Sequence, residues 1–250
     1  MAEPETEAGA GTLYVVATPL GNLEDVTLRA LRVLREVSLV ACEDTRHTRR
    51  LLVAHGIATP TTSYFEHNER FKGAQILETL RSGRDVALVS DAGTPAISDP
   101  GERLVRDARA AGIAVVPVPG PSAATAALSV CGLATDRFLF VGFLPAKPGA
   151  RRKALEALAG ERPTLVFFES PVRAVEALAD MIAAFGDRDA FLCREATKLH
   201  EEYARAPLSS LRERLAAEGR TRREAVKEAA RRLGRPAREV YSIVQDREPE

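Results

Sequence analysis

The sequence predicts an α/β fold, and three observations support this prediction. Short apolar runs bounded by turn residues alternate with amphipathic stretches, which is the pattern of parallel strands joined by helical crossovers. The chain has 250 residues, enough for one large α/β domain or two domains of ordinary size. Hydrophobic residues make up 45% and charged residues 28% of the chain, close to the averages for folded globular proteins.

The first half of the chain is expected to alternate strands with helices. The strands are predicted at Thr12–Ala17, Ser38–Cys42, Asp85–Ser90 and Ile113–Val118. The helices between them are predicted at Leu28–Arg35, Thr45–His55, Phe71–Arg81 and Glu102–Ala111. Pro117, Pro119 and Pro121 fit neither a helix interior nor a central strand, so a domain linker is predicted at Val118–Gly120.

The same alternation continues after the linker. The helices are predicted at Ser122–Val130, Arg151–Ala159 and Val172–Phe185, with a further one around Leu208–Ala217, and the strands at Phe138–Gly142, Thr164–Phe168 and Ala190–Arg194. Asp99 with Pro100, and Ser170 with Pro171, are each interpreted as a helix cap followed by proline at the first helical position. We therefore expect domains over 12–118 and 119–219 with a cleft between them.

The last part of the chain is strongly basic. Residues 220–238 include eight Lys and Arg and two Glu, which gives this segment a net charge of +6. The whole chain, by contrast, has 35 basic and 35 acidic residues. Thr221 and Glu224 form a capping box and Gly234 ends the first helical pattern. Residues 220–246 are predicted to form a short, basic, helix-turn-helix-like extension, and attraction to nucleic acid is expected to be local.

Composition also excludes some classes of site. Cys42, Cys131 and Cys193 are far apart and include no C-x-x-C pair, which argues against a disulfide framework or zinc knuckle and favours a cytoplasmic protein. The four histidines lack metal-ligand spacing, so a metal-free site is expected. No apolar run is long enough to cross a bilayer.

The densest motif is Ser90–Gly101, which follows a predicted strand and leads into a helix. The carboxyl ends of parallel strands are where α/β proteins bind ligands, and Gly93 would let the backbone approach a flat heterocycle. Asp91 could accept hydrogen bonds from a ligand amine or from the loop itself, and the alternative to a binding role is a tight turn. Thr18–Asp25 follows the first strand, so it is expected to line the same edge and contact the ligand. The alternative is a structural role, in which Gly21-Asn22 is a turn and Asp25 caps a helix.

Three further sets of polar residues lie at expected strand or helix ends. Pro119–Ala124 opens a helix beside the linker, where backbone donors and the Ser122 hydroxyl would face the cleft. Glu43–Arg46 is interpreted mainly as a helix cap with an ion pair. Cations follow the later strands and could bind phosphates or form a solvated rim; they are Lys147, Arg151, Arg152, Arg173 and Lys198.

These strings together resemble the tetrapyrrole-methylase-like superfamily of S-adenosylmethionine enzymes. The resemblance covers about Leu13–Ala217, and within the superfamily it is closest to the bacterial enzymes that methylate the 2′-oxygen of cytidine 1402 in 16S ribosomal RNA. It implies two α/β domains of the tetrapyrrole methylase type with S-adenosylmethionine in the cleft, a homodimer, and 16S rRNA within the 30S subunit as partner.

The resemblance also implies roles for particular residues. The expected cofactor contacts are Leu20, Asp91, Ala92, Gly93, Thr94, Ile97, Ser98, Ser122 and Ala123. The expected RNA contacts are Lys147, Arg151, Arg152, Arg173 and Lys198, with Arg222 and Arg223 of the basic extension. A base that activates the ribose hydroxyl could be Glu43, Asp25 or Glu169, or Lys147 if burial lowered its pKa.

One departure and two rival functions stay open. Members of the family usually carry another strand and loop before the basic extension, whereas Glu218-Gly219 here runs directly into Arg220, so the second sheet is expected to lack an edge strand. Either the protein is naturally shorter there or a stretch is missing from the sequence. The rival functions are methylation of a tetrapyrrole or a protein side chain, and RNA binding without catalysis.

Overall fold

The computed structural model describes residues 9–219, and every structural statement below concerns that part of the chain. Its contacts divide it into two compact units. The first unit runs to Gly132 and includes Cys193–Glu202, and the second holds Leu133–Leu192 and the residues from Tyr203 onward. The predicted domain boundary near Val118–Gly120 and the cleft between domains stay predictions. The basic extension, with Arg222 and Arg223, lies outside the described residues.

A parallel five-stranded sheet forms the centre of the first unit. Its strands are β1 (Leu13–Val16), β2 (Leu39–Cys42), β3 (Thr61–Ser63), β4 (Val86–Leu88) and β5 (Val115–Val118), in the spatial order β3-β2-β4-β1-β5. Every neighbouring pair is parallel, which confirms the predicted α/β class. The sequence prediction missed β3, because its three polar residues lack the apolar run that marks a buried strand.

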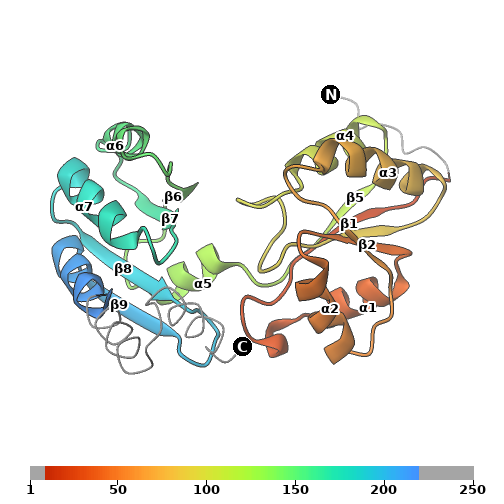
Figure 1. Cartoon of the computed structure of the whole chain (residues 1–250), viewed down its shortest axis with the longest axis horizontal. Coiled ribbons are helices and arrows are strands. Elements are labelled where there is room, and N and C mark those ends of the chain that lie inside the picture. The colour runs from red at the N-terminus through yellow and green to blue at the C-terminus, as the bar shows by residue number, and fades with distance from the viewer. Residues whose placement is uncertain (1–8, 220–250) are drawn as a thin grey trace, which may run out of the picture. The chain divides into compact units, whose positions relative to one another are not determined.

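Helices cover both faces of this sheet (Figure 1). On one face α1 (Leu28–Glu36) and α2 (Thr45–Ala54) bury Leu34 and Leu52 against Val16 and Val40. On the other face α3 (Glu69–Arg81) and α4 (Glu102–Ala110) bury Leu80 against Leu13 and its neighbours. Alternate strand residues face opposite sides, so β1, β2, β4 and β5 each contribute to both cores. All the crossover helices in the first unit lie close to their predicted ranges.

The second unit contains one pair of strands, most of a second pair, and two helices with defined bounds. β6 (Phe138–Phe143) pairs in parallel with β7 (Thr164–Phe168), and β8 (Asp189–Arg194) pairs with β9 (Glu202–Pro207). Helices α6 (Pro148–Glu156) and α7 (Ala174–Phe185) pack together, and residues 208–219 are also helical. The core comprises Leu144, Leu155, Ala177, Met181 and Leu208. β9 was not predicted, since polar residues interrupt its apolar positions.

One predicted helix cap and two predicted helix starts are wrong. α4 begins at Glu102, as predicted, but the residue before it is Gly101, whose φ of 135° is a conformation that glycine adopts without strain, so Asp99 is not its cap. α7 begins at Ala174 rather than Val172, and the residues before it form a turn in which the Arg173 N–H donates to the Ser170 carbonyl at 3.0 Å. α6 begins three residues earlier than predicted, with Pro148 in its first turn, where proline is well tolerated.

Helix α5 (Ala123–Val130) follows β5 and belongs to the first unit. Among residues 9–219, no helix is both long and apolar enough to cross a membrane.

Candidate active site

The loops after β1 and β4 are joined into one surface at the carboxyl edge of the first sheet. The Thr18 N–H donates to the Gly93 carbonyl at 2.9 Å, and the Gly93 N–H donates to the Thr18 carbonyl at 3.0 Å. The Thr18 hydroxyl, in a side chain only 3% exposed, donates to the Ser90 carbonyl at 3.0 Å. Buried hydrogen bonds of this kind hold a loop in one conformation. The Ser90–Gly101 motif is therefore fixed against the first strand.

Gly93 allows its own loop to approach the segments of Leu20 and Pro121 closely. Its φ of +82° favours glycine, and a Cβ there would lie 3.3 Å from Leu20 Cδ2 and 3.8 Å from the Pro121 carbonyl oxygen. The Thr94 hydroxyl donates to the same Pro121 carbonyl at 3.2 Å. Leu20, Gly93 and Thr94, three of the predicted cofactor contacts, are thus brought together. The Pro121 segment leads directly to Ser122, the residue before α5.

The second half of the same loop contains unusual backbone. Ala96 and Ser98 have φ values of 65° and 61°, which cost non-glycine residues about 1–3 kcal/mol each. Between them Ile97 is 50% exposed, a high value for a large apolar side chain. Such strain is concentrated at ligand-binding loops. The predicted cofactor contacts Ile97 and Ser98 therefore lie in a loop that exposes apolar surface at an energetic cost.

The turn after β2 is tied to this loop. Asp44 caps α2, accepts the Arg46 N–H at 2.8 Å and pairs with its guanidinium at 2.9 Å, as the cap interpretation predicted. These bonds to Arg46 lower the pKa of Asp44 to about 2. The Asp44 N–H donates to Asp91 Oδ1 at 3.1 Å. One oxygen of Asp91 is therefore engaged by the protein itself.

Carboxylates gather at this edge. Glu43 is exposed, but partial desolvation raises the pKa of its carboxyl group, and the nearby charges of Asp91, Asp99 and Asp44 raise it further. Burial likewise raises the pKa of Asp99, with a further rise from Asp91 and an opposing hydrogen bond from Ser90. Carboxylates that repel one another in this way would be stabilised by a cationic ligand.

The alternative role of Asp25 as a helix cap is wrong. Asp25 ends a short 3₁₀ helix, η1 (Leu23–Asp25), and the cap of α1 is Thr27, whose hydroxyl accepts the Ala30 N–H at 3.1 Å. The Oδ2 atom of Asp25 is buried and has no hydrogen-bond partner among the described residues. A buried, unpartnered carboxylate oxygen is costly unless something satisfies it. Asp25 therefore stays a candidate for a functional contact.

Lys198 lies against the loop after β1. A Cβ at Gly21 would be 2.2 Å from the Lys198 Cγ atom, and the Lys198 ammonium pairs with Glu195 at 3.0 Å. The first unit therefore places this predicted RNA contact one residue from Leu20. The sequence did not reveal that Thr18 holds the Ser90–Gly101 loop or that Gly21 leaves space for Lys198. Only their place in the Thr18–Leu23 motif pointed to these two residues.

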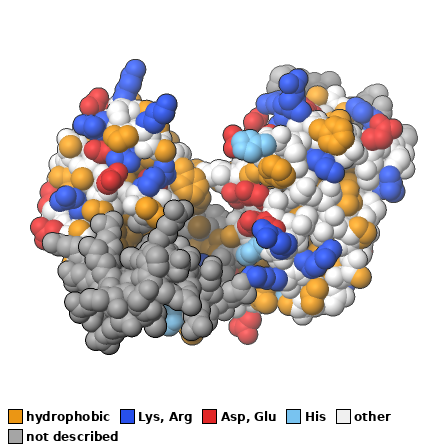
Figure 2. All heavy atoms as spheres, viewed as in Figure 1, with side chains coloured by type: hydrophobic (Ala, Val, Ile, Leu, Met, Phe, Trp, Pro, Cys, Tyr) orange, Lys and Arg blue, Asp and Glu red, His pale blue; other side chains and the backbone are white. Residues whose placement is uncertain are grey.

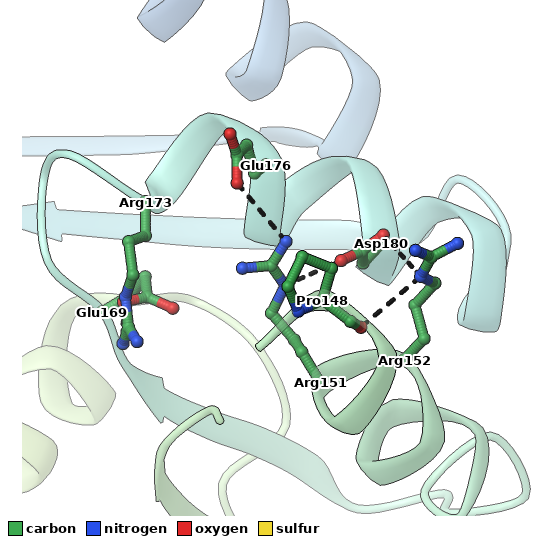
Figure 3. A network of polar contacts seen from close by, with 7 residues as sticks. All are labelled: Pro148, Arg151, Arg152, Glu169, Arg173, Glu176 and Asp180. Carbon is green, nitrogen blue, oxygen red and sulfur yellow. Dashed lines mark hydrogen bonds and ion pairs between the residues drawn. The ribbon is translucent and has the colours of Figure 1, made fainter. Parts of the chain in front are cut away.

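Arg151 is not placed to bind a phosphate. Its side chain is 3% exposed, and its guanidinium lies 2.7 Å from Asp180 and 3.6 Å from Glu176 (Figure 3). The hydrogen bond that Arg151 donates to Asp180 raises the pKa of Arg151, although burial opposes it. The prediction of an RNA contact at Arg151 is corrected to a structural ion pair between α6 and α7. Arg152 is 59% exposed and lies 3.8 Å from Asp180, so its predicted contact stays a prediction.

Glu169 and Arg173 form a second pair in the same unit. Arg173 approaches Glu169 Oε1 at 2.5 Å, while Glu169 Oε2 is buried with no hydrogen-bond partner in the described part of the chain (Figure 3). Lys147 precedes α6 and is exposed, so the burial that would make it a base is missing. The catalytic role of Glu169 and the RNA contact at Arg173 stay predictions.

The first unit thus has the architecture of an α/β domain with a parallel sheet covered on both faces, a class of protein in which ligands bind at the carboxyl ends of the strands. Within residues 9–219, no group of three or more His, Cys, Asp or Glu side chains is arranged to hold a metal ion. The sequence profile of the family described as tetrapyrrole (corrin/porphyrin) methylases matches residues 12–212. The chain belongs to this family.

Curated relatives and solved structures agree with this assignment. A Pseudomonas aeruginosa protein named ribosomal RNA small subunit methyltransferase I is 55% identical over 215 residues, covering 86% of this chain and 76% of that protein. A protein of the same name from Escherichia coli O157:H7 is 52% identical, covering 80% and 71%. The uroporphyrin-III-C-methyltransferase structure from Thermus thermophilus is 25% identical with a TM-score of 0.59, covering 80% of this chain and 87% of its own.

Proposed function

We propose that this chain transfers a methyl group from S-adenosylmethionine to the ribose 2′-oxygen of a cytidine in 16S rRNA, at cytidine 1402 within the 30S subunit. The observation that carries the proposal is the 55% identity, over 86% of the chain, to a protein named for methylating small-subunit ribosomal RNA. Reaction at a 2′-hydroxyl selects RNA over DNA, because DNA lacks that group. Homodimer formation and a cytoplasmic location, both expected from the sequence, belong to the same proposal.

The residues at the first sheet's carboxyl edge suit S-adenosylmethionine. Gly93 and its small neighbours allow backbone atoms to approach a flat adenine ring. The carboxylates of Glu43, Asp91 and Asp99 supply negative charge for a donor that carries a sulfonium and an ammonium. When bound, the donor supplies an electrophilic methyl group. The chain's own task is to orient the ribose oxygen and exclude water.

Glu43 is the candidate base that the first unit supports best. Partial desolvation of this exposed side chain and the neighbouring carboxylates raise the pKa of Glu43, the direction that favours a general base. It stands beside Asp44, whose N–H binds Asp91 of the cofactor loop. In this proposal Glu43 accepts the proton of the ribose hydroxyl as the methyl group is transferred. A positioned base contributes roughly 10²- to 10⁴-fold in rate.

The test is methylation of 30S subunits with labelled S-adenosylmethionine, followed by nucleoside mass spectrometry. We expect 2′-O-methylcytidine at one site, and a fall in kcat of roughly 10²-fold or more for Glu43→Gln. The matched control is Glu78→Gln, because Glu78 is an exposed carboxylate in the last turn of helix α3, away from the carboxyl ends of the strands. Methyl incorporation into a base, or into a tetrapyrrole or protein acceptor instead of 30S subunits, would overturn the proposal.

A further inference from the structure

Helix α2 carries a basic face to which the proposed function assigns no role. Arg46, Arg49 and Arg50 lie within Thr45–Ala54, and the helix contains no acidic residue. Figure 2 shows Lys and Arg side chains on the surface over this part of the first unit. Since the chain as a whole has a net charge of zero, this positive charge is a local feature.

The basic face is hollowed. A cavity of about 350 Å³, open to solvent, is lined by Thr45, Arg46, Arg49, Arg50 and Val53. These positions recur at helical spacing on the side of α2 opposite Leu51 and Leu52, which are buried against the sheet. At the far end of the helix Arg35 donates to the His55 carbonyl at 3.0 Å, which adds a fourth guanidinium. The cations therefore extend along a helix of about 15 Å.

Aromatic side chains lie at the end of the neighbouring strand. β2 and β3 are paired with Cys42 opposite Ser63, so the chain leaves both strands at the same edge of the sheet. Phe65 is 36% exposed, and its ring meets His67 edge-on at a centroid distance of 6.3 Å. Asn68 holds this turn by accepting the Phe65 N–H at 2.9 Å. The turn that carries both rings therefore follows β3 at the edge of the sheet at which α2 begins.

We infer that the Arg46, Arg49, Arg50 and Val53 face of α2, together with Phe65 and His67, binds a single-stranded segment of the RNA substrate. The guanidinium groups bind phosphates, and the rings stack on unpaired bases. The inference rests on the proposed function and extends it to a surface. The acidic sheet edge repels RNA, and the basic face next to it compensates for that repulsion.

The composition of this surface favours RNA over a second protein copy. Stable protein interfaces have an apolar centre depleted in charge. Here the only apolar side chain lining the cavity is Val53, 69% exposed, and arginines provide most of the lining. Asp44 pairs with Arg46 and offsets its charge, so Arg49 is the arginine chosen for substitution.

The experiment measures binding of a fluorescent RNA oligonucleotide that carries the target cytidine, by anisotropy at several salt concentrations. Arg49→Ala should weaken binding and reduce the slope of log K against log salt by about 0.7, the value for one phosphate contact on a single strand. Phe65→Ala should weaken binding roughly fivefold or more and leave that slope unchanged, because stacking releases no counterion. The charge-matched control is Arg106→Ala on α4, which covers the other face of the sheet.

Calorimetry with S-adenosylmethionine and light scattering complete the test. Both variants should bind the cofactor and have the same molar mass as the unmodified chain. Unchanged RNA affinity and salt slope in Arg49→Ala, or an altered oligomeric state in either variant, overturns the inference. The proposed function fails separately, if the unmodified chain does not methylate 30S subunits although it binds the oligonucleotide.

Discussion

The Cγ atom of Lys198 occupies the space that a side chain at Gly21 would need: a Cβ at Gly21 would lie only 2.2 Å from it. Lys198 Cδ and Cε are each 3.1 Å from the same point, so the aliphatic stem of the lysine crosses the loop after β1. The absence of a side chain at Gly21 therefore sets the position of a cation near Leu20. This contact links two motifs that are far apart in the sequence.

Gly21→Ala should displace Lys198 and so reproduce the effect of Lys198→Ala. If Lys198 contacts RNA, both variants should reduce the salt slope of RNA binding by about 0.7. The double variant should bind no more weakly than either single variant, since coupled residues are not additive. Anisotropy measurements of the double-mutant cycle check this. Fully additive losses would show that the two residues act independently.

Gly93→Ala should damage the cofactor loop. A left-handed φ of +82° costs a non-glycine residue about 1–2 kcal/mol, and the new methyl group would lie 3.3 Å from Leu20 Cδ2. We expect a similar fall in the free energy of unfolding and a roughly tenfold weaker affinity for S-adenosylmethionine. Urea unfolding and calorimetry measure the two effects.

The control for Gly93 is Gly149→Ala, where no atom lies within 4 Å of the added Cβ. This change in helix α6 should leave cofactor affinity unaltered. Equal effects at both positions would contradict a specific role for the Gly93 loop.

The strands and helices were predictable where a local pattern specifies them. Leu13–Val16 and Leu39–Cys42 are apolar runs bounded by turn residues, and each became a buried strand. β3 and β9 were missed, because Thr61–Ser63 and Glu202–Pro207 become strands through pairing with a neighbour that no local pattern reveals.

In the candidate site, too, features set by local sequence could be predicted and those set by distant contacts could not. The rule that ligands bind at the carboxyl ends of parallel strands directed attention to Gly93 and Leu20, which the structure brings together. Arg151 was chosen for its charge, but its partner Asp180 comes from a helix 29 residues further along the chain. Whether a cation is available to a ligand depends on such non-local contacts.

Arg151→Ala should destabilise the second unit. It would leave Asp180, which is 17% exposed, without its closest partner. Removing one member of a buried pair costs about 3–5 kcal/mol, and we expect about 2–3 kcal/mol here because Asp180 keeps some contact with water. The double change Arg151→Met with Asp180→Leu should recover most of the loss, since it removes both charges. Chemical denaturation measures these changes in unfolding free energy. If Arg151→Ala binds RNA with the same salt dependence as the unmodified chain, Arg151 has a structural role rather than an RNA contact.

Asp99→Asn should stabilise the protein at neutral pH. Burial, reinforced by the charge of Asp91, raises the folded-state pKa of Asp99 above its unfolded value, so the ionised carboxylate is disfavoured in the folded chain. A group of this kind favours folding below its unfolded pKa of about 3.9 and loses that contribution as the pH rises through the folded pKa. Asparagine removes the charge and can still bond to Ser90. The gain in unfolding free energy over the unmodified chain should therefore be greatest at pH 7 and disappear below about pH 4. Urea titrations across this range measure it, and a stabilisation that persists at pH 3 would show that the charge of Asp99 is not its cause.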